Sequence, residues 1–223
     1  TVLYGANIGS EKSPIVYHAC VAAMFPQRYP ATERPVLISM NSELKDSSPQ
    51  YWKSESQYLF KAFQRKILSL IEDDTCKHFS LFTLAPQPLL IKLGALFTDK
   101  MDVETYQLHR EPKGWFWQDC KDDFDYIIRK PDHFNGAPAL IVSLSDHVSY
   151  ERITRVVGED ISIWEITLEH PHNDFMQAKQ QLSLFRKRLR SLIVDIKREH
   201  GEAAPLHVFP VMPVSCAVEF GRA

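Results

Sequence analysis

Trp115 and Trp117 lie two positions apart in a polar stretch of the chain. In an extended segment such residues point to the same side, and an indole that stacks on a flat ring gains about 1–3 kcal/mol. Packing beneath the polar stretch is the alternative, because tryptophan is highly buried on average whatever its role. The pair is a candidate platform for an aromatic ligand, with core packing as the competing interpretation.

Three polar side chains, Gln107, His109 and Arg110, close the strand-like run at 103–108. An amide can hydrogen-bond the edge of a ring, and a guanidinium can bind a phosphate through two parallel hydrogen bonds. If the strand continues, Gln107 and His109 face one side of the sheet and Arg110 faces the other. For Arg110, an ion pair at the rim is an equal alternative.

Ser143, Ser145 and Asp146 end the apolar run at 139–144, and Asn41 with Ser42 occupies the corresponding place earlier in the chain. Their hydroxyl, carboxylate and amide groups can hydrogen-bond a sugar or a base. Turn formation and helix capping are the favoured alternative for any single one of them.

Two helices are predicted to begin directly after strands, each behind a proline, at Pro86-Gln87 and at Pro213-Val214. A helix start presents backbone N–H groups without intrahelical partners and a partial positive charge, which suits a phosphate. Every α/β fold has helix starts at such places, so this pattern has low specificity.

His170 and His172 are the nearest approach to a metal-ligand pattern, but no carboxylate or cysteine partner accompanies them, so we expect no metal site. Asn173 is predicted to cap the long helix that follows, with Asp174 in its first turn. The densest basic run is interpreted as the solvated face of that helix, with contact to DNA or to a neighbouring subunit as the alternative. It comprises Arg186, Lys187, Arg188 and Arg190.

The composition is that of an ordinary globular protein, with 223 residues, 44% hydrophobic and 24% charged, and a net charge of -2. This balance disfavours disorder and a globally basic surface, so an anionic ligand must be held by a local cluster. The four cysteines are far apart without a CxxC, which argues against a zinc ribbon and a disulfide framework. With no apolar run of about 18 residues and no signal-peptide layout, we expect a cytoplasmic protein that contacts no membrane.

Apolar strand-like runs alternate with amphipathic helical stretches, the pattern of an α/β protein with a mostly parallel sheet. The order occurs twice, in two halves joined by a polar connector or insertion at 111–136. Neither GxGxxG nor GxxxxGK[ST] occurs, so no glycine-rich phosphate loop is expected. The expected strands are 35–40, 78–84, 103–108, 139–144, 161–168 and 206–211, and the expected helices are 15–25, 59–71, 86–97, 150–157 and 173–199, with one more opened by Pro213.

In parallel α/β sheets the ligand crevice lies outside the carboxyl ends of the strands, where the connections diverge. The loops that reach this edge are 40–43, 84–87, 107–110, 143–146, 168–173 and 210–213, and the last of these adds Pro210, Met212 and Pro213 to the candidate ligand-binding residues. If the two halves pair edge to edge, their crevices merge into one pocket with approximate two-fold symmetry. Such a pocket suits a two-fold ligand.

Four segments carry a further pattern: Gly5-Ala-Asn-Ile-Gly9, Pro86-Gln-Pro-Leu-Leu-Ile-Lys-Leu-Gly94, Tyr106-Gln-Leu-His-Arg110 with the two tryptophans, and the run from Leu206 to Arg222. Together they resemble a SAVED domain, in which two Rossmann-like halves, each similar to a CARF sensor domain, are fused in one chain. The last segment is the most specific. The first and third resemble the branch in which SAVED follows an HNH nuclease, as in effectors of CBASS anti-phage defence.

The resemblance spans residues 1–223 and implies a first CARF-like half at 1–118 and a second at 119–223, with a truncated carboxyl end. It implies a bacterial sensor that uses no cofactor and takes a cyclic oligonucleotide as its activating ligand. The favoured ligand is a cyclic dinucleotide such as a cGAMP isomer, and a cyclic trinucleotide is the second choice. The family further implies self-association on ligand binding and activation of a fused DNA-degrading effector.

No HNH constellation lies in this chain, so we assign no catalytic residue and expect DNA to be reached only through a nuclease domain outside it. Two other functions stay open. One is a Rossmann-like phosphodiesterase or hydrolase that cleaves a cyclic nucleotide, and the other is an interaction scaffold that associates independently of any nucleotide.

Overall fold

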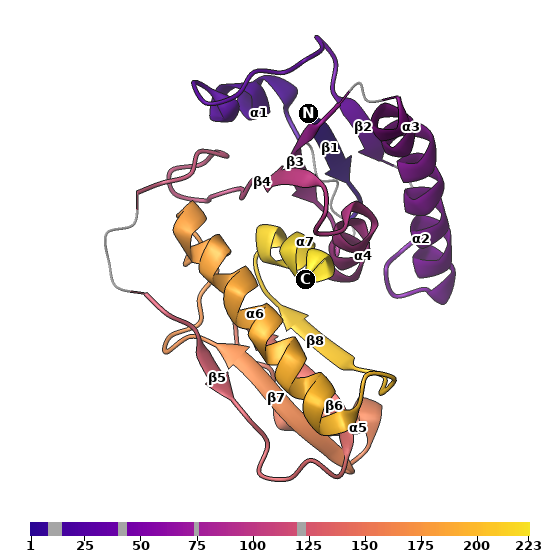
Figure 1. Cartoon of the computed structure of the whole chain (residues 1–223), viewed down its shortest axis with the longest axis vertical. Coiled ribbons are helices and arrows are strands. Elements are labelled where there is room, and N and C mark those ends of the chain that lie inside the picture. Colours follow the sequence, from indigo (N-terminus) through magenta and orange to yellow (C-terminus); the bar gives the residue numbers. More distant parts are fainter. Residues whose placement is uncertain (9–14, 40–43, 74–75, 120–123) are drawn as a thin grey trace. The chain divides into compact units, whose positions relative to one another are not determined.

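The computed structural model describes residues 1–8, 15–39, 44–73, 76–119 and 124–223. They form two compact units: the first consists of Thr1–Trp117 with Ala217–Ala223, and the second of Gln118–Cys216. Each unit holds one four-stranded, mostly parallel sheet with helices on both of its faces (Figure 1). The predicted α/β class is therefore confirmed.

The first sheet is entirely parallel and has the order β2-β1-β3-β4. One of its two inner strands, β1, is not among the predicted strands, because a four-residue apolar segment is too short to show a period of two. The strands are β1 (Val2–Gly5), β2 (Val36–Ser39), β3 (His78–Leu84) and β4 (Asp102–Thr105).

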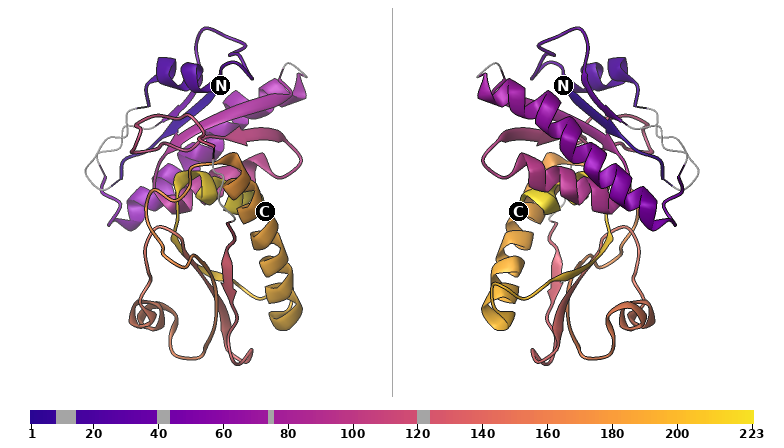
Figure 2. Two further views of the ribbon diagram at one scale, coloured as in Figure 1. Left: turned by 90° about the vertical axis from the view of Figure 1, so that its left-hand side faces the viewer. Right: turned by 90° about the vertical axis from the view of Figure 1, so that its right-hand side faces the viewer.

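Alternation along the strands separates the two faces of this sheet. Leu3 and Phe82 pack with Cys20 of α1 (Tyr17–Met24) on one face. The other face is covered by a long helical segment that keeps its apolar residues at three-to-four-residue spacing, and by α4 (Figure 2). These helices are α2 (Pro49–Phe63), the π-helical turn η1 (Gln64–Leu68), α3 (Ser69–Glu72) and α4 (Gln87–Phe97).

The second sheet has the order β5-β7-β6-β8, and only β5 runs antiparallel to its neighbour. β5 lies in the stretch that was predicted as a connector or insertion. α5 packs on the face that carries Ala139 and Ile141, and α6 covers the face of Trp164 (Figure 2). The elements are β5 (Ile127–Arg129), β6 (Ala137–Ser143), α5 (Tyr150–Val157), β7 (Ile161–Thr167), α6 (Lys179–His200), β8 (His207–Val211) and α7 (Val214–Arg222).

α6 begins at Lys179, so the predicted start at residue 173 is wrong. The Gln181 side chain explains the shift, because its Oε1 accepts hydrogen bonds from the backbone N–H of Gln177 at 2.8 Å and of Ala178 at 2.9 Å. These bonds satisfy amides just before the first turn. Asn173 lies in an irregular segment ahead of the helix and does not cap it.

α7 starts in the second unit, and its last residues cluster with the first. The order of segments along the sequence does not predict that the end of α7 belongs to the first unit. Among the described residues, no helix is both long enough and apolar enough to cross a membrane.

Candidate functional site

Each sheet has a point at its carboxyl edge where the connections diverge. In the first sheet the chain passes from β1 to β2 on one side and then crosses to β3 on the other side of β1. The β1–β3 ladder ends at this point, where the N–H of Ala6, just beyond β1, donates to the carbonyl of Leu84, the last residue of β3, at 3.0 Å. In α/β folds this is where a ligand crevice forms.

Gln87 lies beside this point as the first residue of α4. Pro86 precedes it with extended backbone, and the Pro86 carbonyl accepts the N–H groups of Leu89 and Leu90 at 3.0 and 3.2 Å. Pro88 lies in the first turn, where its missing N–H would have no intrahelical partner. The helix start directs its partial positive charge to the carboxyl edge. The helix start predicted from sequence is confirmed.

The strand predicted at 103–108 ends earlier, because β4 stops at Thr105. Gln107 and His109 therefore do not alternate on a strand. The buried Gln107 amide donates to the Leu108 carbonyl at 2.9 Å, and the His109 backbone closes a loop by two hydrogen bonds with Gly114. Arg110 is exposed at the turn of this loop.

The two tryptophans pack toward the core of the first unit. Trp115 is 3% exposed and meets Phe82 edge-on, with ring centroids 5.2 Å apart. Trp117 is half-buried against the same cluster and lies edge-on to His109 at 5.8 Å. For Trp115 the structure matches the packing alternative, because neither face of a buried indole is open to a ligand.

Phe116, between the tryptophans, is 53% exposed. The same alternation that turns Trp115 and Trp117 inward turns this ring outward. Sequence reasoning missed it, although the period of two was already visible. Phe116 is the most exposed aromatic side chain of this loop, and it lies in the same short segment as Arg110.

The second sheet repeats the arrangement of the first. Its chain passes from β6 to β7 on one side and crosses to β8 on the other. The N–H groups of Leu144 and Ser145 both donate to the carbonyl of Val211, at 2.9 and 3.0 Å. The predicted loops at 143–146 and 210–213 are thus brought together at this edge, and the His172 N–H adds the third loop by donating to the Leu144 carbonyl at 3.1 Å.

The predicted residues of this edge differ in what they can offer. Ser143 is fully buried and donates to the carboxylate of Glu165, which also pairs with Arg129 at 2.8 Å, so Ser143 serves the sheet rather than the crevice. Ser145 is half-buried. The exposed Asp146 accepts the N–H of His147 at 2.7 Å, as in a turn.

The loop after β8 offers mainly backbone and apolar surface. Pro210 lies inside β8, where an edge strand tolerates a residue without an N–H, and it is half-buried. Met212 and Pro213 are buried, and α7 begins at the next residue as predicted. Asn41 and Ser42 lie outside the described residues, as does Gly9 of the amino-terminal motif.

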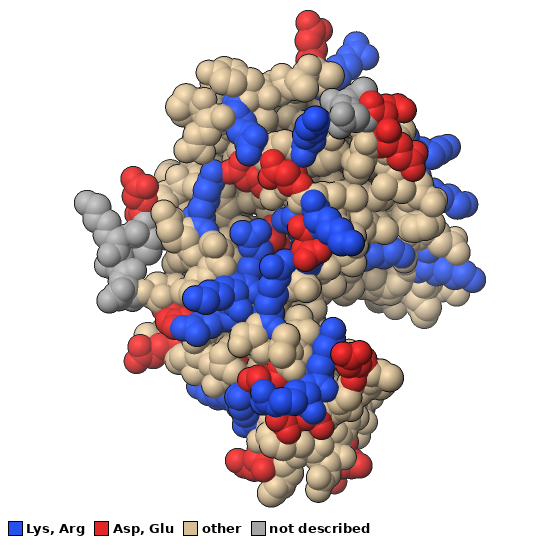
Figure 3. Space-filling model, in the orientation of Figure 1, with Lys and Arg blue, Asp and Glu red and all other residues tan. Residues whose placement is uncertain are grey.

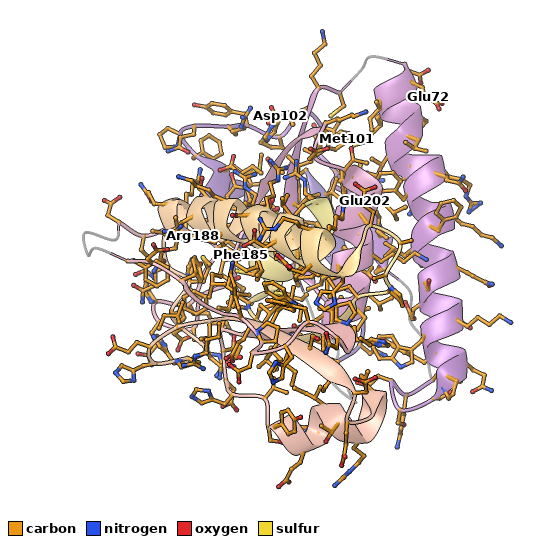
Figure 4. All side chains as sticks on the ribbon, turned by 60° about the horizontal axis from the view of Figure 1, so that its bottom comes forward. Glu72, Met101, Asp102, Phe185, Arg188 and Glu202 are labelled. Carbon is orange, nitrogen blue, oxygen red and sulfur yellow. The ribbon has the colours of Figure 1, made fainter. Side chains whose placement is uncertain are left out.

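The basic run lies on α6, as predicted, and lysine and arginine side chains gather over this helix (Figure 3). Arg188 extends from α6 (Figure 4). It pairs with Asp125, and this hydrogen-bonded guanidinium lowers the pKa of the Asp125 carboxyl. In the described part of the chain, no three His, Cys, Asp or Glu side chains are grouped to hold a metal ion.

Comparison with solved structures shows the same fold in the Cap4 SAVED/CARF-domain containing receptor of Acinetobacter baumannii. The receptor with the cyclic trinucleotide 3'3'3'-cAAA is 14% identical, with a TM-score of 0.56 over 79% of this chain and 39% of the receptor. The receptor with 2'3'3'-cAAA gives 13% identity and a TM-score of 0.57 over the same shares. This chain therefore spans well under half the length of the receptor that it resembles.

Comparison with curated protein sequences finds no match. A family model does match: SAVED, the "SMODS-associated and fused to various effectors sensor domain", aligns with residues 59–223. This range covers the whole of the second sequence half and the part of the first half from the end of α2 through β3, α4 and β4 to the aromatic loop. The chain belongs to the SAVED family of sensor domains.

Proposed function

We propose that this chain is the ligand-binding module of a sensor and that its ligand is a cyclic oligonucleotide. One observation carries the proposal: both sheets of a SAVED-family chain have a topological switch point at their carboxyl edge, between β1 and β3 in one sheet and between β6 and β8 in the other. A switch point is where open α/β sheets take ligands. The similar fold of a receptor described with cyclic trinucleotides supports the class of ligand.

The groups at these edges suit a nucleotide ring. The amino ends of α4 and α7 favour phosphate by their partial charge, Arg110 adds a guanidinium, and Phe116 adds an exposed aromatic face. Ser145 and Asp146 add polar atoms for sugar or base. A cyclic dinucleotide such as a cGAMP isomer and a cyclic trinucleotide are the two ring sizes to separate by experiment.

The wider activity follows from the same proposal. The halves at 1–118 and 119–223 act as two CARF-like modules, with Ala217–Ala223 of the second half completing the compact unit of the first. The bound form self-associates and switches on a fused nuclease of HNH type in anti-phage defence. The ligand does this only through its higher affinity for the assembled state. In this account the chain itself catalyses no reaction.

The test is a thermal-shift screen with cyclic di-, tri- and tetranucleotides, using linear and mononucleotide controls. A ligand at about 100 times its Kd stabilises the fold by about 2.7 kcal/mol, which raises Tm by a few degrees in a chain of this size. One selective cyclic hit that stays intact on long incubation supports the sensor. Cleavage of the bound nucleotide would support a phosphodiesterase. Self-association of the chain in the absence of nucleotide would support an interaction scaffold.

The exposed aromatic ring supplies a sharper prediction. Phe116→Ala removes a stacking contact of about 1–3 kcal/mol, so the Kd of the selective ligand rises by about fivefold to about a hundredfold while Tm without ligand is unchanged. Phe60→Ala is the matched control, because Phe60 is 43% exposed on α2. Equal Kd values for both variants and the wild type, measured by calorimetry, would remove Phe116 from the site.

A further inference from the structure

Polar side chains are buried together on the first sheet beneath α2. Tyr4 of β1 and Thr83 of β3 are paired in parallel register and therefore share this face of the sheet. Glu55 lies on the face of α2 that also carries Tyr51 and Leu59. Tyr4 and Glu55 are each 1% exposed, and Thr83 is 0% exposed.

These polar groups lack the partners that burial usually requires. Within the described ranges of the chain, the hydroxyl groups of Tyr4 and Thr83 and both carboxyl oxygens of Glu55 make no hydrogen bond. An isolated buried carboxylate is so unfavourable that the group binds a proton instead. Burial accordingly raises the pKa of Glu55.

The titratable groups around Glu55 come from three elements. Tyr4 faces it from β1, since burial and then Glu55 raise the pKa of the Tyr4 phenol. Burial and then Glu55 also raise the pKa of Tyr51 on α2 to about 12. α4 contributes a cation, Lys92, but its ammonium donates to the hydroxyl of Ser56 and no ion pair joins it to Glu55 among the described residues.

The helix that carries Glu55 also holds the strand ends of the first sheet. The hydroxyl of Tyr51 donates to the carbonyl of Asn7 at 2.9 Å, just beyond β1. The hydroxyl of Tyr58 donates to the carbonyl of Ser39 at 2.6 Å, at the end of β2. A change in how α2 packs on the sheet therefore reaches the carboxyl edge directly.

We propose that Glu55 is a proton-dependent latch, which keeps α2 closed on the first sheet while its carboxyl is protonated and loosens α2 when the carboxyl ionises. The latch acts on the position of the Asn7 and Ser39 carbonyls through Tyr51 and Tyr58. Its effect on packing is independent of any ligand. An effect on ligand affinity would rest on the proposed function.

The direction of the pH dependence follows from the raised pKa. An unfolded glutamate releases its proton near pH 4.5, whereas folded Glu55 keeps it to higher pH. Unfolding in this window releases a proton, so stability is lost as pH rises. The equilibrium constant for closing α2 falls by up to about tenfold per pH unit until the folded carboxyl itself ionises.

The experiment compares the wild-type chain with Glu55→Gln between pH 5 and 9. Hydrogen–deuterium exchange of peptides from α2, corrected for the intrinsic rate at each pH, measures opening of the helix, and Tm measures overall stability. We expect α2 of the wild type to lose protection progressively with rising pH and the glutamine variant, which cannot ionise, to keep it. Glu72→Gln is the control, because Glu72 is an exposed carboxylate on α3 of the same unit (Figure 4).

A carbon-13 NMR titration of the Glu55 carboxyl gives an independent measurement. A midpoint at or below the ordinary value for glutamate, or equal pH dependence of α2 exchange in the wild type and Glu55→Gln, would overturn the latch. Neither measurement uses a ligand, so this failure would leave the sensor proposal standing. A failed nucleotide screen would likewise leave the latch standing.

Discussion

Arg222 and Glu219 form a buried ion pair that organises one end of the first unit. Their exposures are 7% and 2%, and the guanidinium lies 3.1 Å from the carboxylate. The Thr105 hydroxyl also donates to Glu219 at 2.8 Å, while Arg222 donates to the carbonyl of Met101 at 2.8 Å. Because both charges are paired and hydrogen-bonded, burial is tolerated here, in contrast to Glu55.

Removing the cation of this pair is therefore expected to be costly. Arg222→Met leaves the Glu219 carboxylate buried without its counter-charge and costs about 3–5 kcal/mol of unfolding free energy, measured by urea denaturation. Arg28→Met is the control: Arg28 is half-exposed beside Glu104 at 3.5 Å, and such a pair contributes about 1 kcal/mol or less. Similar losses in both variants would contradict the buried-pair account.

At the scale of elements, α4 and α7 approach each other through glycine. A Cβ on Gly94 would lie 2.0 Å from the Val218 carbonyl oxygen, and a Cβ on Gly221 would lie 1.8 Å from the Ile91 carbonyl oxygen. Both obstacles are backbone atoms, which cannot turn aside as a side chain can. The two helices can adopt this spacing only because both positions lack a side chain.

Gly221→Ala therefore forces the helices apart. We expect the free energy of unfolding to fall by about 1–3 kcal/mol or more, as is typical of overpacking in a well-packed interior. Urea denaturation would show this as a lower midpoint. Gly114→Ala is the control, because its Cβ would meet only the Phe116 ring at an ordinary 3.4 Å. A glycine-to-alanine change at 221 that leaves the midpoint unchanged would mean that α7 is not held at this spacing.

At the scale of the whole molecule, the two compact units are not two consecutive stretches of sequence. The first unit consists of Thr1–Trp117 and Ala217–Ala223, so its helix layer is completed by the end of the chain. These last residues include Glu219 and Arg222, which hydrogen-bond to β4 and to the loop before it. Residues 1–117 alone lack these contacts.

Deleting Ala217–Ala223 is expected to destabilise the first unit selectively. Hydrogen exchange should quicken in α4 and β4, which lose their packing and hydrogen-bond partners, while β6 and β7 keep their protection. Deletion of Ala223 alone is the control, and it should leave hydrogen exchange unchanged in both sheets. Equal loss of protection in both sheets would show that the two units unfold together.

Much of the element pattern could be predicted because it depends on neighbours in sequence. β3 and α5 match their predicted bounds, and the helix starts behind Pro86 and Pro213 are confirmed. The error at β1 arose from distant contacts, because this short strand gains its place between two partner strands. The error at the start of α6 had a local cause, since the Gln181 side chain bonds backbone amides three and four residues before it.

The candidate site was predicted less completely than the fold. Sequence identified the loops of the carboxyl edge, because strand ends and helix starts leave local signals. Burial of individual side chains was not visible, since it depends on which distant residues cover them. Ser143 hydrogen-bonds to Glu165 and Trp115 packs on Phe82, whereas Phe116 is exposed.

By itself, the sequence determined the α/β class, the two-fold repetition of strands and helices and the family resemblance, because periodicity, prolines and turn residues act locally. Only the tertiary structure decided the strand order, the place of each switch point, the return of α7 and the burial of Glu55. Each of these depends on contacts between residues far apart in the chain, such as Val211 with Ser145 and Arg222 with Met101. No pattern within one segment reports such contacts.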